Sequence, residues 1–260
     1  MPGRQPHQPE DCFAVGAVAM DTGQEATYKV AADRVKSEYF GTTDITFHEP
    51  EMREHTGRYE FGGDVVRQAE FDAAVNRLVG ESDFVVFGVG IRKRAFEEEF
   101  VQQGLDPYLP FDVYALAIHL LLERYVDYLN GQPRPTTGRL TFESQGPKED
   151  AIHQREYVEL LVRGTQWVPP SAFRGLLEPG VRFTRKSGSD AMELADMVSR
   201  DLYEWTRDGC AAQPLRWGVL TRKIYRRDDM AMGKFGVKVF PDSDIRQLIE
   251  EHRAVADGAE

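Results

Sequence analysis

The sequence has little that would place it in a membrane or in an oxidising compartment. Its two cysteines, Cys12 and Cys210, lie far apart and outside any C-x-x-C pattern. They predict neither a zinc site nor a disulfide framework, and both are expected to be reduced. The longest apolar run, residues 114–122, contains a histidine and is far shorter than the ~20 residues of a membrane helix. The first residues lack the apolar core of a signal peptide, so we expect a cytoplasmic protein without a membrane partner.

Several common catalytic motifs are also missing. The chain has no G-x-S-x-G, no P-loop and no Ser/Lys arrangement, which argues against acyl transfer and ATP hydrolysis. Two histidines occur in FHEPEMREH, but His48 and His55 are seven residues apart with Pro50 between them, so they do not form the H-E-x-x-H of a zinc protease. The segment GVGIRK has Lys93 where a dinucleotide-binding loop needs its third glycine.

Strand and helix patterns alternate along the chain. Nearly continuous apolar runs predict two buried strands, and shorter patterns predict two more, at residues 13–20, 82–91, 138–144 and 181–186. Helical spacing fills the intervals, at residues 25–41, 64–78, 110–131, 149–163 and 189–207. Residues 42–63 are polar and acidic and contain a proline, which predicts a long loop with a short helical piece. Strands separated by helices predict an α/β fold.

No linker divides the chain convincingly. We expect a disordered or extended segment at 1–12, one α/β domain at 13–210, and a peripheral basic and aromatic extension at 211–260 with a terminal helix from 244 to 256. The net charge is −11, yet residues 216–238 carry seven Lys or Arg residues against two aspartates. An acidic protein gains no long-range attraction to nucleic acid, so any such binding must be local.

The basic stretch allows two interpretations. Arg222, Lys223, Arg226 and Arg227 could contact phosphates while the interleaved aromatic residues stack on unpaired bases. Equally, a strand hairpin could turn the aromatic side chains to the core and the cations to water. The residues alone leave both interpretations open.

Two acidic residues could be ligands or ordinary surface groups. Glu143 ends a predicted strand and opens into a loop, where α/β folds often bind ligands and where exposed turn residues are equally common. Asp196 lies roughly 140° from the centre of the apolar face of its helix, so periodicity does not bury it. A mid-helix aspartate has poor helix propensity, and this makes Asp196 only mildly unexpected.

Three segments in order, FHEPEMRE, TFESQG and TRKSGSDAMELADMVS, resemble the bacterial and phage family called domain of unknown function 3800. The apolar runs at 13–20 and 82–93 are similar to two strands of that family, so the resemblance spans about residues 13 to 209. It implies a ribonuclease-H-like mixed sheet flanked by helices. On this chain, the long acidic loop and the basic C-terminal extension would be additions to that fold.

The resemblance also implies a site. Glu49, Glu143 and Asp196 would bind Mg²⁺ or Mn²⁺ and catalyse phosphodiester hydrolysis, with His48 and Lys186 near the phosphate. Hard divalent cations prefer carboxylate oxygens, and a pair of them can activate water and stabilise the leaving oxygen.

The chain departs from the family at two positions. The family's Glu-Ser-Arg is Glu143-Ser144-Gln145 here, which removes a cation. The family usually opens with a strand ending in Asp-Glu-Ser-Gly, which this sequence lacks. Asp11 and Asp21 flank the first predicted strand without matching that motif. A site without its central acid would bind metal weakly or not at all.

These observations predict a divalent-metal-dependent nuclease or a degenerate descendant of one. The alternative is a non-catalytic nucleic-acid- or protein-binding module of the same fold, in a mobile-element or defence setting. A third, weaker interpretation is an enzyme that acts on another phosphate ester. DNA cannot be distinguished from RNA in this sequence, and the oligomeric state is open.

Overall fold

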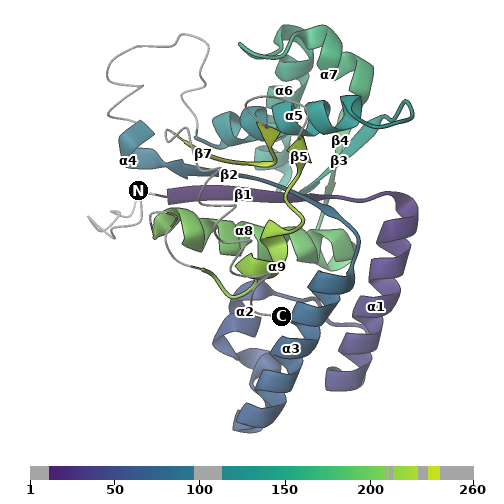
Figure 1. The fold of residues 1–260 in the computed structure, drawn as a ribbon, viewed down its shortest axis with the longest axis vertical. Helices are drawn as coiled ribbons and strands as arrows, with labels where there is room; N and C mark the ends of the chain where they lie inside the picture. The colour runs from purple at the N-terminus through teal and green to yellow at the C-terminus, as the bar shows by residue number, and fades with distance from the viewer. Residues whose placement is uncertain (1–11, 97–112, 209, 211–212, 228–233, 241–260) are drawn as a thin grey trace.

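The computed structural model describes residues 12–96, 113–208, 210, 213–227 and 234–240. It has an α/β fold, as the alternating patterns predict. A central sheet separates two groups of helices, and a hydrophobic core lies on each of its faces (Figure 1). Residues 1–11 of the predicted segment 1–12 and the predicted helix at 244–256 lie outside the described residues, whereas Cys12 begins β1. Within the described ranges, no helix is long and apolar enough to cross a membrane.

The central sheet has the strand order β1-β2-β7. Its members are β1 (Cys12–Ala19), β2 (Val85–Arg92) and β7 (Val237–Phe240). β2 runs antiparallel to β1, from Cys12 opposite Arg92 to Ala19 opposite Val85, and parallel to β7. β2 is buried along most of its length because it lies between two strands and packs against both cores, which explains its continuous apolar sequence.

Two smaller sheets complete the strand inventory of the described ranges. One is the parallel pair of β3 (Gly138–Glu143) and β4 (Leu177–Thr184), and the other is the short antiparallel pair of β5 (Arg226–Arg227) and β6 (Lys234–Phe235). Apolar side chains of β1, β3 and β4 pack against the same core.

The helices divide between the two faces of the central sheet (Figure 1). One face is covered by α1 (Thr22–Phe40), α3 (Val65–Glu81), α8 (Asp190–Arg207) and α9 (Trp217–Thr221). The other is covered by α5 (Val113–Asn130), α6 (Pro147–Arg163) and α7 (Pro170–Leu176). Short helices lie in the connections: α2 (Glu49–Glu54), η1 (Gly57–Tyr59), η2 (Phe61–Gly63), α4 (Lys93–Phe96) and η4 (Lys186–Gly188).

Local signals explain where the helices begin and end. The Asp21 carboxylate accepts hydrogen bonds from the first amides of α1, and Gln24 closes a capping box with it. Gly41 ends α1 with φ 70°, a left-handed conformation that suits glycine. Asp64 caps α3 in the same manner as Asp21.

The loop that was expected at 42–63 does contain a short helix, but it is not simply solvated. Phe47, Met52 and Tyr59 are buried in the core beneath α1 and α3. Apolar residues spread over an irregular segment show no periodicity, which is why the sequence pattern indicates only polarity here.

The prediction of a peripheral C-terminal extension is wrong for the described residues after 213. β7 belongs to the central sheet, and the ring of Trp217 stacks on that of Trp205 with centroids 4.6 Å apart. Arg216 is almost completely buried. These short segments bury their side chains against α8 and β2, and contacts so distant in sequence leave no local pattern.

α8 packs unusually close to β1. A Cβ built on Gly16 would lie 2.5 Å from the backbone nitrogen of Ser199 and 2.8 Å from Cγ1 of Val198. The Ser199 hydroxyl accepts a hydrogen bond of 2.9 Å from the Gly16 amide. Because Gly16 has no side chain, α8 can lie close to β1, and the acidic residues of α8 are held near the sheet.

We expect Gly16→Ala to lower the free energy of unfolding by about 1–3 kcal/mol, because the methyl group must push α8 away from β1. Urea denaturation followed by circular dichroism measures this. Gly180→Ala is the matched control, since Gly180 is also a strand glycine and has open space around it. Equal stability of the two variants would contradict the tight contact.

Candidate functional site

Asp196 and Glu49 do come together, but through the backbone of Glu49. Oδ2 of Asp196 accepts a hydrogen bond of 3.1 Å from the Glu49 amide and lies 2.8 Å from Nζ of Lys186. His48, the residue before α2, makes no side-chain cap. Asp196 therefore caps α2 from another helix, and a carboxylate at a helix N-terminus is favourable.

The carboxylate of Glu49 lies in a buried cluster of arginines. Its Oε1 is 2.7 Å from Nη2 of Arg53 and 3.2 Å from Nη1 of Arg216, and its Oε2 is 3.9 Å from Nε of Arg200. Glu49 and Arg216 are both fully buried. A carboxylate with these partners is already charge-compensated, so it does not fit the role of a metal ligand.

Two further acids of α8 complete this arginine–carboxylate cluster. Asp201 is buried, with Oδ1 2.6 Å from Nη2 of Arg53 and Oδ2 accepting a 2.8 Å hydrogen bond from the Arg216 amide. Glu204 lies 2.6 Å from Nη1 of Arg53 and 3.0 Å from Arg200. Burial raises the pKa of Asp201 to about 6, and the charges of Arg216 and Arg53 oppose that rise. The cluster as a whole joins α2, α8 and the start of α9.

Glu143 ends β3 opposite Thr184, the last residue of β4. Lys186 follows two residues later and reaches Asp196, so Glu143, Lys186 and Asp196 belong to neighbouring segments. The half-buried carboxylate of Glu143 has no hydrogen bond or ion pair within the described part of the chain. His48 is turned to Glu51, with Nδ1 3.3 Å from Oε1.

This set of side chains does not fit the predicted metal centre. Glu49 is held by arginines, and Asp196 is held by Lys186 and the Glu49 amide. Across the described ranges, no group of three or more His, Cys, Asp or Glu side chains is arranged to hold a metal ion. The contacts of Glu49 therefore favour a structural role, and its assignment as a Mg²⁺ or Mn²⁺ ligand stays a prediction. Sequence spacing indicates which residues approach one another but not which atom of Glu49 faces Asp196.

The four cations that the sequence selects for nucleic-acid contact line one hollow of about 860 Å³. Arg222, Lys223, Arg226 and Arg227 lie around it on the segment that runs from the end of α9 through β5, together with Tyr225. Asp83 and Phe84, just before β2, and Tyr128, near the end of α5, supply its other walls. We call it the basic hollow.

Backbone hydrogen bonds fix the segment that carries these cations. The Val86 amide donates to the Lys223 carbonyl at 2.8 Å, and the Tyr225 amide donates to the Val86 carbonyl at 3.1 Å. Nζ of Lys223 donates to the Ser82 carbonyl at 2.5 Å and lies 4.8 Å from the centre of the Phe84 ring. Burial lowers the pKa of Lys223, and Asp83 opposes that fall.

Asp127 of α5 is the acid that partly balances the basic hollow. Nη1 of Arg227 lies 3.0 Å from its Oδ1, and the Tyr225 hydroxyl donates to its Oδ2 at 3.1 Å. Arg227 and Lys223 thus help to hold the walls together. Among the described residues, four cations line the hollow, Asp83 lines it with them, and Asp127 pairs with one of them.

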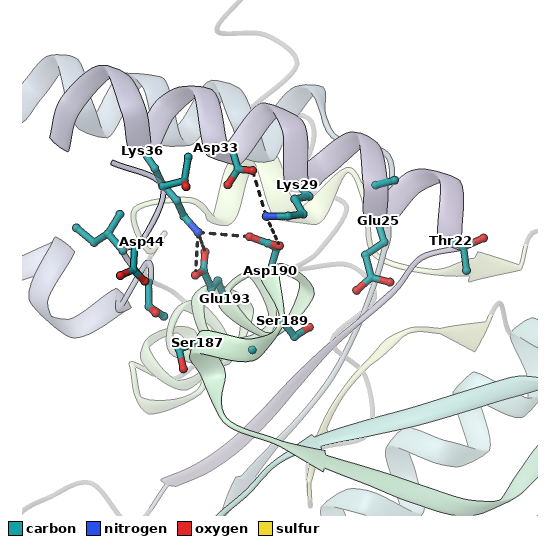
Figure 2. A pocket seen from close by; sticks show the side chains of 15 residues that line it. Thr22, Glu25, Lys29, Asp33, Lys36, Asp44, Ser187, Ser189, Asp190 and Glu193 are labelled. Atoms are coloured by element: carbon teal, nitrogen blue, oxygen red, sulfur yellow. Dashed lines mark hydrogen bonds and ion pairs between the residues drawn. The ribbon is translucent and has the colours of Figure 1, made fainter. Parts of the chain in front are cut away.

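A second pocket, of about 500 Å³, lies between α1, residues 43–46 and the start of α8. Figure 2 shows Lys36 placed between Asp190 and Glu193, and Lys29 between Asp33 and Asp190. Nζ of Lys36 is 2.9 Å from Oε2 of Glu193 and 3.3 Å from Oδ1 of Asp190. Burial raises the pKa of Glu193 to about 7, although Lys36 opposes this.

The sequence analysis missed the charged residues buried on α8. Asp201 lies seven residues after Leu194 and four after Met197, and both of these are core residues. This spacing puts Asp201 on the apolar face, where an acid needs a buried partner. Arg53 and Arg216 gave no comparable signal. Arg53 lies on a helix of six residues and Arg216 precedes a helix of five, and such short helices show no apolar periodicity against which a buried charge would stand out.

Comparison of the chain with protein-family models, with curated proteins and with solved structures gives no match. The resemblance described above therefore stays a prediction, and the α/β fold is the established part of it.

Replacing Glu49 distinguishes a structural role, in which it pairs with buried arginines, from a role as a metal ligand. We expect Glu49→Gln to lower the free energy of unfolding by about 3–5 kcal/mol, because it removes the ion-pair partner of the buried Arg216 and one of the three acids around Arg53. Titration calorimetry with Mg²⁺ should give the same result for this variant and the native protein. Glu143→Gln is the control and should leave stability nearly unchanged. If Glu49→Gln is as stable as the native protein and loses metal binding, Glu49 is a ligand after all.

Glu193 should make stability depend on pH. The folded protein holds the Glu193 proton more tightly than the unfolded chain, so folding takes up protons between the ordinary pKa of 4.5 and about 7. The contribution of Glu193 to stability therefore falls as pH rises through this range. Urea denaturation across these pH values should show a fall that is smaller in Glu193→Gln by a few kcal/mol. Glu25→Gln, at an exposed position in the same pocket, should follow the native curve.

Proposed function

We propose that this protein binds the backbone of a nucleic acid at the basic hollow, as a non-cleaving descendant of a ribonuclease-H-like nuclease. The observation that carries the proposal is the convergence of Arg222, Lys223, Arg226 and Arg227 on one hollow. The alternative interpretation is confirmed for the aromatic side chains, since Trp217 lies in one core and Tyr225 and Phe240 pack against the other, but it does not by itself explain why four cations share one hollow.

The charge distribution explains how an acidic protein could bind a polyanion. The net charge of −11 repels nucleic acid from most of the surface, so the attraction must come from contacts inside the basic hollow. Each phosphate that a Lys or Arg neutralises releases counterions, so the affinity should fall steeply with salt. All four cations also contact other residues of the protein, and what favours phosphate binding is their shared location.

The aromatic rings of the basic hollow favour a ligand with unpaired bases. Tyr128 and Tyr225 line it together with the cations, and their rings contact each other edge to face at 5.4 Å. Half-buried tyrosines beside arginines can stack on a base while the cations bind the adjoining phosphates. A paired duplex does not offer its base faces in this way, so we propose a single strand as the ligand.

The partners of Glu49 support the non-cleaving part of this proposal. Two-metal hydrolysis needs a set of free carboxylates, and the acid that the family resemblance assigns from the α2 segment is compensated by Arg53 and Arg216. Asp196 and Glu143 remain, and Lys186 already occupies one oxygen of Asp196.

Fluorescence anisotropy with labelled single-stranded and duplex oligonucleotides tests the binding. We expect tighter binding of the single strand, and at least a roughly tenfold loss of affinity in Arg222→Ala/Arg226→Ala. The slope of log affinity against log salt should fall by about one to one and a half for the two lost contacts. Lys223 and Arg227 are left intact because their contacts with the Ser82 carbonyl and Asp127 hold the walls of the hollow.

Arg58→Ala removes an exposed cation outside the basic hollow and should bind like the native protein. Binding that is insensitive to salt, or an equal loss in Arg58→Ala, would remove the basic hollow from the proposal.

Incubation with Mg²⁺ or Mn²⁺ should leave the bound oligonucleotide uncut over hours, as followed by gel electrophoresis. If cleavage does occur, and if Asp196→Asn and Glu143→Gln abolish it while binding persists, the protein is an active nuclease and the non-cleaving assignment is wrong.

A further inference from the structure

The outer face of α6 exposes three branched aliphatic side chains. α6 lies with α7 at the end of the molecule opposite α2 and α3 (Figure 1). Its inner side buries Tyr157 and Leu160, whereas Ile152, Val158 and Val162 are 40%, 41% and 64% exposed. Single exposed aliphatic residues are common, but Val158 and Val162 are one turn apart, and together with Ile152 on the same outer side of the helix they form a surface that a partner could cover.

Trp167 extends this patch beyond the end of the helix and is 75% exposed. The turn that holds it is braced. Oγ1 of Thr165 accepts hydrogen bonds from the amides of Trp167 and Val168, at 3.3 and 3.1 Å, and the Thr165 amide donates to the Val168 carbonyl at 2.9 Å. A large ring held in solvent on a fixed turn is typical of a residue that anchors an interface.

The charges on the same face alternate in sign. Arg155, Glu159 and Arg163 follow one another at intervals of four residues, and all three are exposed. Glu159 lies 3.8 Å from Arg163 within the helix. A face that carries both signs in alternation can pair with a copy of itself.

We propose that α6 and Trp167 form the interface of a homodimer, in which α6 packs antiparallel against α6 of a second copy. A twofold axis at the level of residue 157 places Ile152 opposite Val162 of the second copy and Arg155 opposite Glu159 of the second copy. Twofold symmetry repeats each contact. The two apolar pairs and the two ion pairs are therefore satisfied together.

The charges select this register. A shift of the axis by two residues toward the C-terminus places Arg155 opposite Arg163 and Glu159 opposite itself. The equal shift toward the N-terminus places Arg155 opposite itself. Like charges in contact disfavour both alternatives. In the selected register, Trp167 lies at the level of the exposed Pro147 of the second copy, at the start of its α6.

The interface is confined to one helix and one turn. Stable interfaces bury about 1,200–2,000 Å² in total, and a single helix pair lies at the low end. We therefore expect a dimer that dissociates in the micromolar range. We take the partner to be a second copy of this chain because the alternating charges on α6 are complementary to those on another α6 in the antiparallel arrangement.

Sedimentation equilibrium of the full chain, from low micromolar to several hundred micromolar, measures the association. We expect Arg155→Glu to weaken the dimer at least about tenfold, because the new carboxylate then faces the carboxylate of Glu159 in the second copy. The charge exchange Arg155→Glu/Glu159→Arg should restore it, which a merely structural role for these residues would not predict. Trp167→Ala should also weaken the dimer.

Val162→Asp places a charge in the patch and should give a monomer. Val65→Asp is its matched control, since Val65 is 70% exposed on α3, at the other end of the molecule, and should remain dimeric. A native protein that is monomeric throughout the range overturns the proposal. So does a charge exchange that fails to restore association, or an equal effect of the two Val→Asp changes.

Discussion

The compensation of one buried negative charge holds together three segments that are distant along the chain. Glu49 begins α2, and its carboxylate meets Arg53 of the same helix and Arg216 at the start of α9. Asp201 of α8 binds the same two arginines. Removing these charges from water is unfavourable, and their mutual attraction offsets this desolvation free energy only when all of them are in place. The loop after α1, the helix α8 and the segment before β7 are therefore fixed relative to one another by electrostatics as well as by packing.

The same compensation decides what the acidic residues can do. A carboxylate that neutralises arginines has little left to offer a cation, whereas Asp196, beside it, serves the amide of Glu49 and the ammonium of Lys186. Acids that resemble a metal site in sequence thus act here as structural ligands for the protein's own cations and amides. The cations of the basic hollow are different. Their backbone is held by β2 and they gather around one hollow, which is the basis of the proposed phosphate binding.

Much of the fold could be predicted from the sequence, because its helices and strands are long enough to show their period. The strands β1 and β2 and the helices α1, α3, α5, α6 and α8 fall where apolar spacing indicates. β7 could not be found in this way, since it is a four-residue strand with a partner early in the chain. For the site, the family resemblance named Glu49 and Asp196 together, and the structure places the Glu49 amide 3.1 Å from the Asp196 carboxylate. The direction of the Glu49 side chain depends on Arg216, and such a distant partner leaves no mark on local spacing.

The position of β7 has a consequence for how the chain is made. β2 pairs through Gly88 with Val237, so one edge of the central strand of the sheet waits for residues that are synthesised much later. At ordinary translation rates this delay is on the order of ten seconds. During that time the apolar strand β2 has an edge of unpaired backbone amides and carbonyls, and such an edge can pair with a strand of another chain. The order of the strands alone therefore leaves this edge of β2 without β7 until the last part of the chain has been made.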